Sequence, residues 1–149
     1  VFIEDLVGGD RFTDDLQKVF TLWDTYVFAD FITYPSLWEG WGNQLLEAIR
    51  AKVPFLIFEY PVYKADIKEK GLRGVSLGDQ VVDSDAAGLV QVDPQKIEEA
   101  ADQALHLLID NEARQAMVDH NYDVAREHYS MVALRQQMEQ MVSRLSIAR

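Results

Sequence analysis

The segment between residues 30 and 59 constrains the fold most, because it alternates apolar and amphipathic stretches over a short distance. Asp30–Tyr34 and Pro54–Glu59 are apolar runs typical of buried strands, and Asn43–Lys52 carries its apolar residues at helical spacing. A strand, a helix and a strand within about 30 residues predict a βαβ unit with parallel strands and a right-handed crossover. Sheets of this kind bind ligands at the carboxyl ends of their strands, where a strand leads through a loop into a helix.

The rest of the chain continues this alternation. Thr13, followed by two aspartates, predicts the start of a helix whose apolar face extends to Val27. Asp93 and Pro94 predict another helix start, because aspartate caps free amides and proline fits the first helical position. The remaining predicted elements are strands at Val1–Glu4, Gly74–Leu77 and Gly88–Val92 and helices at Asn111–Glu127 and Met131–Leu145. The chain is therefore predicted to be an α/β protein with a Rossmann-like, mainly parallel sheet and flanking helices.

Composition narrows the class of protein further. The chain has 149 residues, of which 48% are hydrophobic and 26% charged, as expected of a single globular domain at residues 1–149. A formal net charge of −11 argues against nucleic-acid or anionic-membrane binding, which requires clustered lysine and arginine. The apolar runs are too short to span a membrane, and the chain has no cysteine. We expect a cytoplasmic protein and, since the chain begins at Val1 inside a predicted strand, a fragment of a longer one.

The loop after the first strand of the βαβ unit, "PSLWEGWGN", carries the residues suited to ligand binding. Glycine lets a ligand approach the backbone, and the helix that starts at Asn43 offers free N–H groups and a partial positive charge to a phosphate. Glu39 and Glu47 can lie about 10 Å apart on either side of this helix start. Because each carboxylate can accept hydrogen bonds from two adjacent hydroxyl groups, the pattern predicts a site for a nucleotide sugar.

The same residues also have a purely structural interpretation. A glutamate on a polar helix face is usually solvated, and Trp38 and Trp41 can be packing residues. Four basic residues after the second strand either reach an anionic substrate or, as we favour, form a solvated loop: Lys64, Lys68, Lys70 and Arg73. No pair of histidines has metal-ligand spacing supported by a carboxylate partner, so we expect no metal site and surface or packing roles for His106, His120 and His128.

Residues 29–58, "ADFITYPSLWEGWGNQLLEAIRAKVPFLIF", resemble the signature of glycosyltransferase family 4, a large group of retaining GT-B transferases. The shared elements are a strand that ends in Pro-Ser, a Glu-Gly-aromatic-Gly turn, a second glutamate after seven intervening residues, and a strand led by Pro54. Residues 87–117, "AGLVQVDPQKIEEAADQALHLLIDNEARQAM", are similar to the family's closing strand and the helix after it.

The resemblance implies a role for each residue of this motif. Glu39 would be the catalytic residue, in contact with hydroxyl groups of the donor sugar near the reacting carbon, and Glu47 would hold the ribose hydroxyls. Main-chain amides would face the sugar and the diphosphate, so that the donor site also includes Ser36, Gly40, Trp41, Gly42 and Asn43. Family members transfer a glycosyl group with retention from a nucleotide-diphosphate sugar, usually without a metal ion, and we expect no other cofactor.

The chain lacks two strands and a domain that belong to the family pattern. The family has two strands upstream of the position of Val1, with an arginine and a lysine that grip the diphosphate, and a separate acceptor-binding domain. We therefore expect little or no activity from the isolated chain, and exposed strand edges that lead to self-association. The alternative function is a non-catalytic nucleotide-binding or assembly module that retained the motif.

Overall fold

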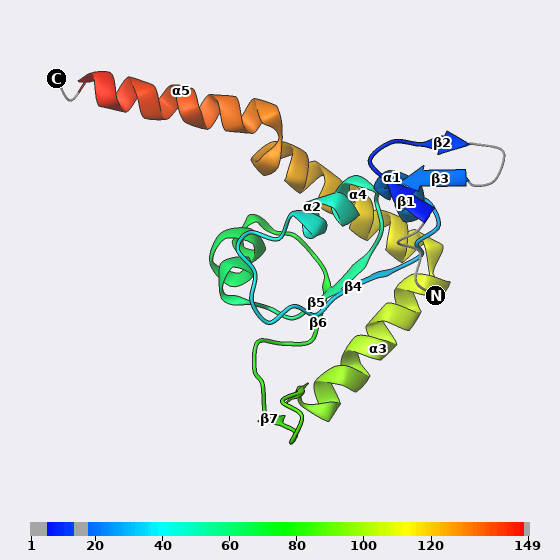
Figure 1. Ribbon diagram of the computed structural model, residues 1–149. Helices are drawn as coiled ribbons and strands as arrows, with labels where there is room; N and C mark the ends of the chain where they lie inside the picture. Colours follow the sequence, from blue (N-terminus) through cyan, green and yellow to red (C-terminus); the bar gives the residue numbers. More distant parts are fainter. Residues whose placement is uncertain (1–5, 14–17, 148–149) are drawn as a thin grey trace.

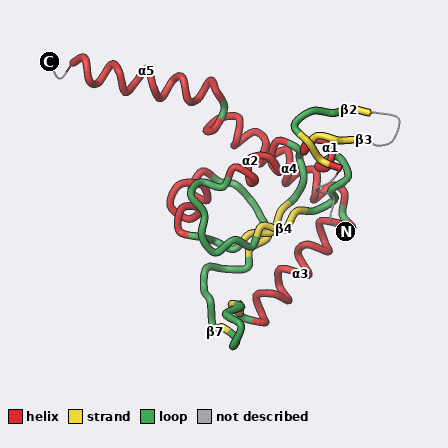
Figure 2. The backbone as a smooth tube through the Cα atoms, viewed as in Figure 1, coloured by secondary structure: helices red, strands yellow, loops and turns green. Residues whose placement is uncertain are grey.

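The computed structural model describes residues 6–13 and 18–147 and places a parallel sheet at the centre of the molecule (Figures 1 and 2). Its strand order is β4–β5–β6, with bounds β4 (Ile32–Tyr34), β5 (Phe55–Ile57) and β6 (Val75–Ser76). Ile32 lies opposite Phe55, and Leu56 lies opposite Val75. Helices flank this sheet, so the prediction of an α/β fold with a mainly parallel sheet is confirmed.

Helix α2 (Asn43–Arg50) connects β4 to β5 and completes the predicted βαβ unit. Its apolar residues Leu45, Ala48 and Ile49 are buried, as their helical spacing predicts. Each large apolar side chain that is fully buried stabilises the fold by about 1.5–3 kcal/mol. The core cluster beneath the helix consists of Leu45, Ile49, Phe55, Ile57, Tyr60, Tyr63, Ile67 and Leu72.

The C-terminal part of the chain forms three helices, α3 (Pro94–Ile109), α4 (Asn111–Tyr129) and α5 (Met131–Ile147). The predicted start of α3 is confirmed, because the Asp93 side chain accepts a hydrogen bond from the Gln95 amide at 2.9 Å. Helix α3 packs on β6, and α4 packs on α2. Helix α5 contacts α4 and extends away from the sheet, with an exposed apolar face (Figure 1). The expected self-association of the chain stays a prediction.

The first part of the chain differs from its prediction. The prediction of a continuous helix from Thr13 to Val27 was wrong. Strand β3 (Lys18–Thr21) lies within that range and forms the middle of a small sheet, between β1 (Val7–Gly8) and β2 (Phe12–Thr13). Helix α1 begins only at Leu22, because Thr21 and Asp24 form a capping box at its N-terminus, and it ends at Tyr26. The predicted strand Val1–Glu4 lies outside the residues that the structure describes.

The segment between β5 and α3 contains more structure than the predicted loop. A π-helical turn at Tyr63–Ile67 and a 3₁₀ turn at Lys68–Lys70 precede β6. The predicted strand near Gly88–Val92 is present as β8 (Val90–Gln91), but it pairs antiparallel with β7 (Asp83–Ser84), apart from the parallel sheet. The Asp85 carboxylate closes this hairpin by accepting hydrogen bonds from the amides of Ala87 and Leu89. Within the described ranges, no helix combines the length and apolarity that a membrane span requires.

Candidate functional site

The predicted site residues lie together at the carboxyl end of β4, in the loop that leads into α2. The loop begins after Tyr34, and α2 begins at Asn43, as the sequence predicted. Ser36, Glu39, Trp41 and Glu47 are half-buried, Gly40 and Asn43 are exposed, and Gly42 is buried. The polar groups of the motif are therefore partly accessible at the edge of the sheet where α/β proteins bind ligands.

The two glycines of the motif have different roles. Gly42 is the N-cap of α2 and has a left-handed backbone with φ of 87°. A Cβ atom at Gly42 would lie 2.4 Å from the hydroxyl of Tyr60, which is completely buried and donates a hydrogen bond to the Trp41 carbonyl at 3.2 Å. The space at Gly40 is open. Packing against Tyr60 therefore requires glycine at position 42, whereas Gly40 is the position where a ligand can approach the backbone.

Helix α2 begins without a side-chain cap. Gly42 has no side chain, and the first turn contains no acidic residue. The amide of Leu45 donates to the Gly42 carbonyl at 3.0 Å, but the preceding N–H groups have no partner in an α-helix. These N–H groups and the helix dipole make the helix start locally positive in a chain of net charge −11. The phosphate contact at this position stays a prediction.

Glu39 lies beside two tyrosine hydroxyls. Burial raises the pKa of Tyr34, and the Glu39 carboxylate raises it further; the same two causes raise the pKa of Tyr60. The two tyrosine rings pack edge to face with their centroids 6.3 Å apart. The hydroxyl of Tyr34 also donates to the Gln44 side chain at 3.3 Å. Neither tyrosine was predicted to belong to the site, although Tyr34 ends the first strand of the βαβ unit and Tyr60 follows the second.

Glu47 is anchored to α1. The hydroxyl of Tyr26 donates a hydrogen bond to Glu47 Oε2 at 3.0 Å. The pKa of Tyr26 is raised to about 12, mainly by burial and further by the Glu47 carboxylate. The Arg50 guanidinium lies 4.5 Å from the Trp23 ring, which provides a second contact between α2 and α1. The interpretation of Glu47 as a simply solvated side chain is therefore wrong.

The two tryptophans of the loop differ in exposure. The Trp41 ring packs against Tyr129 of α4, with centroids 4.8 Å apart, so its side chain has the packing role that the sequence left open. Trp38 is 76% exposed and is not a packing residue of the described chain. The Trp41 side chain therefore packs on α4, and the contact of its main chain with a donor stays a prediction.

A further carboxylate at the same edge of the sheet was not predicted. Glu59 follows β5, with a side chain that is 12% exposed; it accepts a hydrogen bond from Ser76 Oγ at 2.8 Å and pairs with Lys68 at 2.6 Å. Lys64 pairs with Asp79 at 2.6 Å. Because Lys64 and Lys68 are each paired with a carboxylate, the structure favours a structural role for these two lysines over contact with an anionic substrate. The sequence signal for Glu59 is its position directly after an apolar strand.

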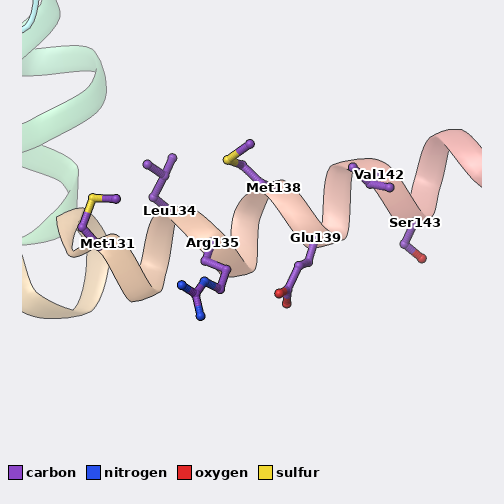
Figure 3. A pocket seen from close by; sticks show the side chains of 7 residues that line it. All are labelled: Met131, Leu134, Arg135, Met138, Glu139, Val142 and Ser143. Carbon is purple, nitrogen blue, oxygen red and sulfur yellow. The ribbon is translucent and has the colours of Figure 1, made fainter.

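The exposed surface of α5 is separate from this loop. It carries the apolar side chains Met131, Leu134, Met138 and Val142 on one side and the polar side chains Arg135, Glu139 and Ser143 on the other (Figure 3). None of the predicted site residues contributes to it. Among the residues that the structure describes, no group of three or more histidine, aspartate or glutamate side chains is arranged to hold a metal ion.

Comparisons with known proteins connect the chain to part of two curated proteins. It is 46% identical over 133 residues to a protein named mannosylglucosylglycerate synthase from Thermotoga maritima. It is 46% identical over 102 residues to a protein of the same name from Petrotoga mobilis. The matches cover 89% and 68% of this chain but only 30% and 23% of those proteins. The chain thus spans less than a third of the length of these relatives. No family model and no solved structure matches it.

Proposed function

We propose that residues 1–149 form the donor-binding domain of a longer, retaining glycosyltransferase of family 4. The observation that supports this proposal is a helix start without a side-chain cap at the carboxyl end of a parallel strand, with the half-buried Glu39 in the loop before it and the half-buried Glu47 within the helix. The names of the two relatives support a glycosyltransferase. By extension from these names, the full protein synthesises mannosylglucosylglycerate.

In this proposal the donor is a nucleotide-diphosphate sugar that lies across the start of α2. The amides of residues 40–43 hold the diphosphate, since main-chain donors can bind an anion without a cluster of basic side chains. Glu47 accepts hydrogen bonds from the ribose hydroxyls. Glu39 and Ser36 bind the sugar to be transferred. Both carboxylates act as acceptors, which suits them to hydroxyl groups.

The chemistry that we propose requires stabilisation of the departing diphosphate. Negative charge develops on the diphosphate as the glycosidic bond breaks, and N–H groups already aimed at that position lower the barrier without reorganising. Glu39 holds the sugar hydroxyls near the reacting carbon. In this proposal the acceptor hydroxyl attacks that carbon from the face that the diphosphate leaves, which retains the configuration, and its proton passes to the departing diphosphate. We propose no metal ion and no cofactor other than the donor.

Replacing Glu47 by glutamine tests the donor site. The intact protein is titrated by calorimetry with GDP-, UDP- and ADP-linked hexoses. We expect one donor to bind and Glu47→Gln to weaken its binding by about 1.5–3 kcal/mol, because the hydrogen bonds to a charged acceptor are lost. Glu98→Gln, at an exposed position of α3, is the matched control and is expected to leave the affinity unchanged.

Three outcomes separate the functions. Donor consumption in the presence of an acceptor supports the glycosyltransferase. Donor binding without turnover supports the non-catalytic nucleotide-binding module. If the wild-type protein binds none of these donors, or if Glu47→Gln binds as well as wild type, the proposed donor site is wrong.

A further inference from the structure

We propose that Tyr26 is a positioning residue that orients the Glu47 carboxylate toward the ribose of the donor. This inference rests on the proposed function, in which Glu47 holds the ribose hydroxyls. The hydrogen bond from Tyr26 to Glu47 Oε2, at 3.0 Å, joins residues 21 positions apart in the chain. Tyr26 lies on α1, outside the loop and helix that carry the motif, so the motif itself does not point to it.

Tyr26 is held in place by its neighbours on α1 and α2. Its ring lies 5.7 Å from the ring of Trp23, and the Arg50 guanidinium lies 4.5 Å from the same Trp23 ring. The capping box at its first turn stabilises the short helix α1. Two contacts between side chains therefore dock α1 on α2, and one of them ends on the carboxylate of Glu47.

The hydrogen bond restricts a torsion that is otherwise free. The terminal torsion of a glutamate is broad, so an unrestrained carboxylate turns among many orientations. Tyr26 donates to one oxygen, which leaves Oε1 and a second lone pair on Oε2 of Glu47 available to the two ribose hydroxyls. The pKa of Tyr26 is raised to about 12 by burial and by this carboxylate, so its hydroxyl stays protonated and donating at neutral pH. The carboxylate is thus oriented in advance of binding, which lowers the entropy lost when the ligand binds.

Tyr26→Phe tests this role, because it removes only the hydroxyl. The intact protein is titrated with GDP, UDP and ADP, and then with the 2′,3′-dideoxy form of the nucleotide that binds. We expect Tyr26→Phe to weaken binding of the ribonucleotide about fivefold, the size of one ordinary hydrogen bond, and to leave the dideoxynucleotide unaffected. In the Glu47→Ala background, which removes the acceptor, Tyr26→Phe is expected to have no further effect, since the two residues act as one unit.

Two variants serve as controls. Tyr122→Phe removes an exposed tyrosine hydroxyl on α4, outside the proposed site, and is expected to leave the ratio of ribonucleotide to dideoxynucleotide affinity unchanged. Glu47→Asp keeps a carboxylate but withdraws it from Tyr26, so it is expected to lose the preference for ribose independently of any change at Tyr26. Adding Tyr26→Phe to Glu47→Asp is therefore expected to weaken neither nucleotide further, and an additional loss overturns the inference.

The possible results distinguish this inference from the proposed function. If Tyr26→Phe weakens both nucleotides equally, or retains its effect when Glu47 is alanine, Tyr26 acts on structure and the inference is overturned. If the wild-type protein binds a nucleotide and Tyr26→Phe changes nothing, the inference alone fails. If the wild-type protein binds no nucleotide, the proposed function fails and the inference fails with it.

Discussion

Replacing Gly42 by alanine tests the packing that shapes the motif loop. The left-handed backbone at Gly42, with φ of 87°, costs a residue with a Cβ atom about 1–2 kcal/mol. The new Cβ would also lie 2.4 Å from the Tyr60 hydroxyl, and Tyr60 is completely buried. Displacing a side chain in a packed core costs about 1–3 kcal/mol. We therefore expect Gly42→Ala to lower the free energy of unfolding by about 2–5 kcal/mol, the sum of these two effects.

Two further variants separate the backbone effect from the steric one. Gly40 has open space around it and no left-handed backbone, so Gly40→Ala is expected to change stability by less than about 0.5 kcal/mol. Tyr60→Phe removes the atom that the new Cβ would meet but loses the hydrogen bond to the Trp41 carbonyl, worth about 0.5–1.5 kcal/mol. In Gly42→Ala/Tyr60→Phe the steric effect is relieved, so the loss is expected to be smaller than the sum of the single losses.

Urea denaturation followed by circular dichroism measures these differences. The shift of the midpoint at constant slope gives the change in the free energy of unfolding. Thermal melts provide a second measure, since 1 kcal/mol corresponds to about 2–4 °C in a chain of this size. Equal effects of Gly42→Ala and Gly40→Ala, or additive effects of Gly42→Ala and Tyr60→Phe, would refute the reasoning.

Two other predictions concern stability. The buried Asn121 side chain accepts from the Arg73 amide at 2.8 Å and donates to the Arg73 carbonyl at 2.6 Å, so Asn121→Ala leaves two backbone groups unpaired. We expect a loss of about 2–4 kcal/mol in urea denaturation, and a loss below about 1 kcal/mol contradicts this role. The pKa values of Tyr26 and Tyr63 are raised from 10.0 to about 12, mainly by burial, so the unfolded chain releases these protons first as the pH rises. The free energy of unfolding should therefore fall between about pH 10 and 12. Tyr26→Phe should reduce this fall in denaturation series at several pH values, and an identical fall argues against the assignment.

Much of the fold was predictable because its signals are local. The apolar spacing between Asn43 and Lys52 predicted α2 to within two residues of its observed end at Arg50. The aspartate and proline at residues 93 and 94 predicted the start of α3. The prediction failed at β3, where the same apolar residues fit either a strand or a helix. Pairing with β1 and β2, which no local pattern reveals, decided between the two.

The amino-acid sequence by itself determined where the candidate site lies and which chemistry its side chains offer. A strand, a glycine-containing loop and a helix start are encoded within a few neighbouring residues, and Glu39 and Glu47 are carried there by the chain. Only the tertiary structure decided what orients these residues: Tyr26 reaches Glu47 from 21 positions away, and Tyr60 reaches the Trp41 carbonyl from 19. Such partners depend on how α1, α2 and the sheet pack together, and that packing is a property of the whole core.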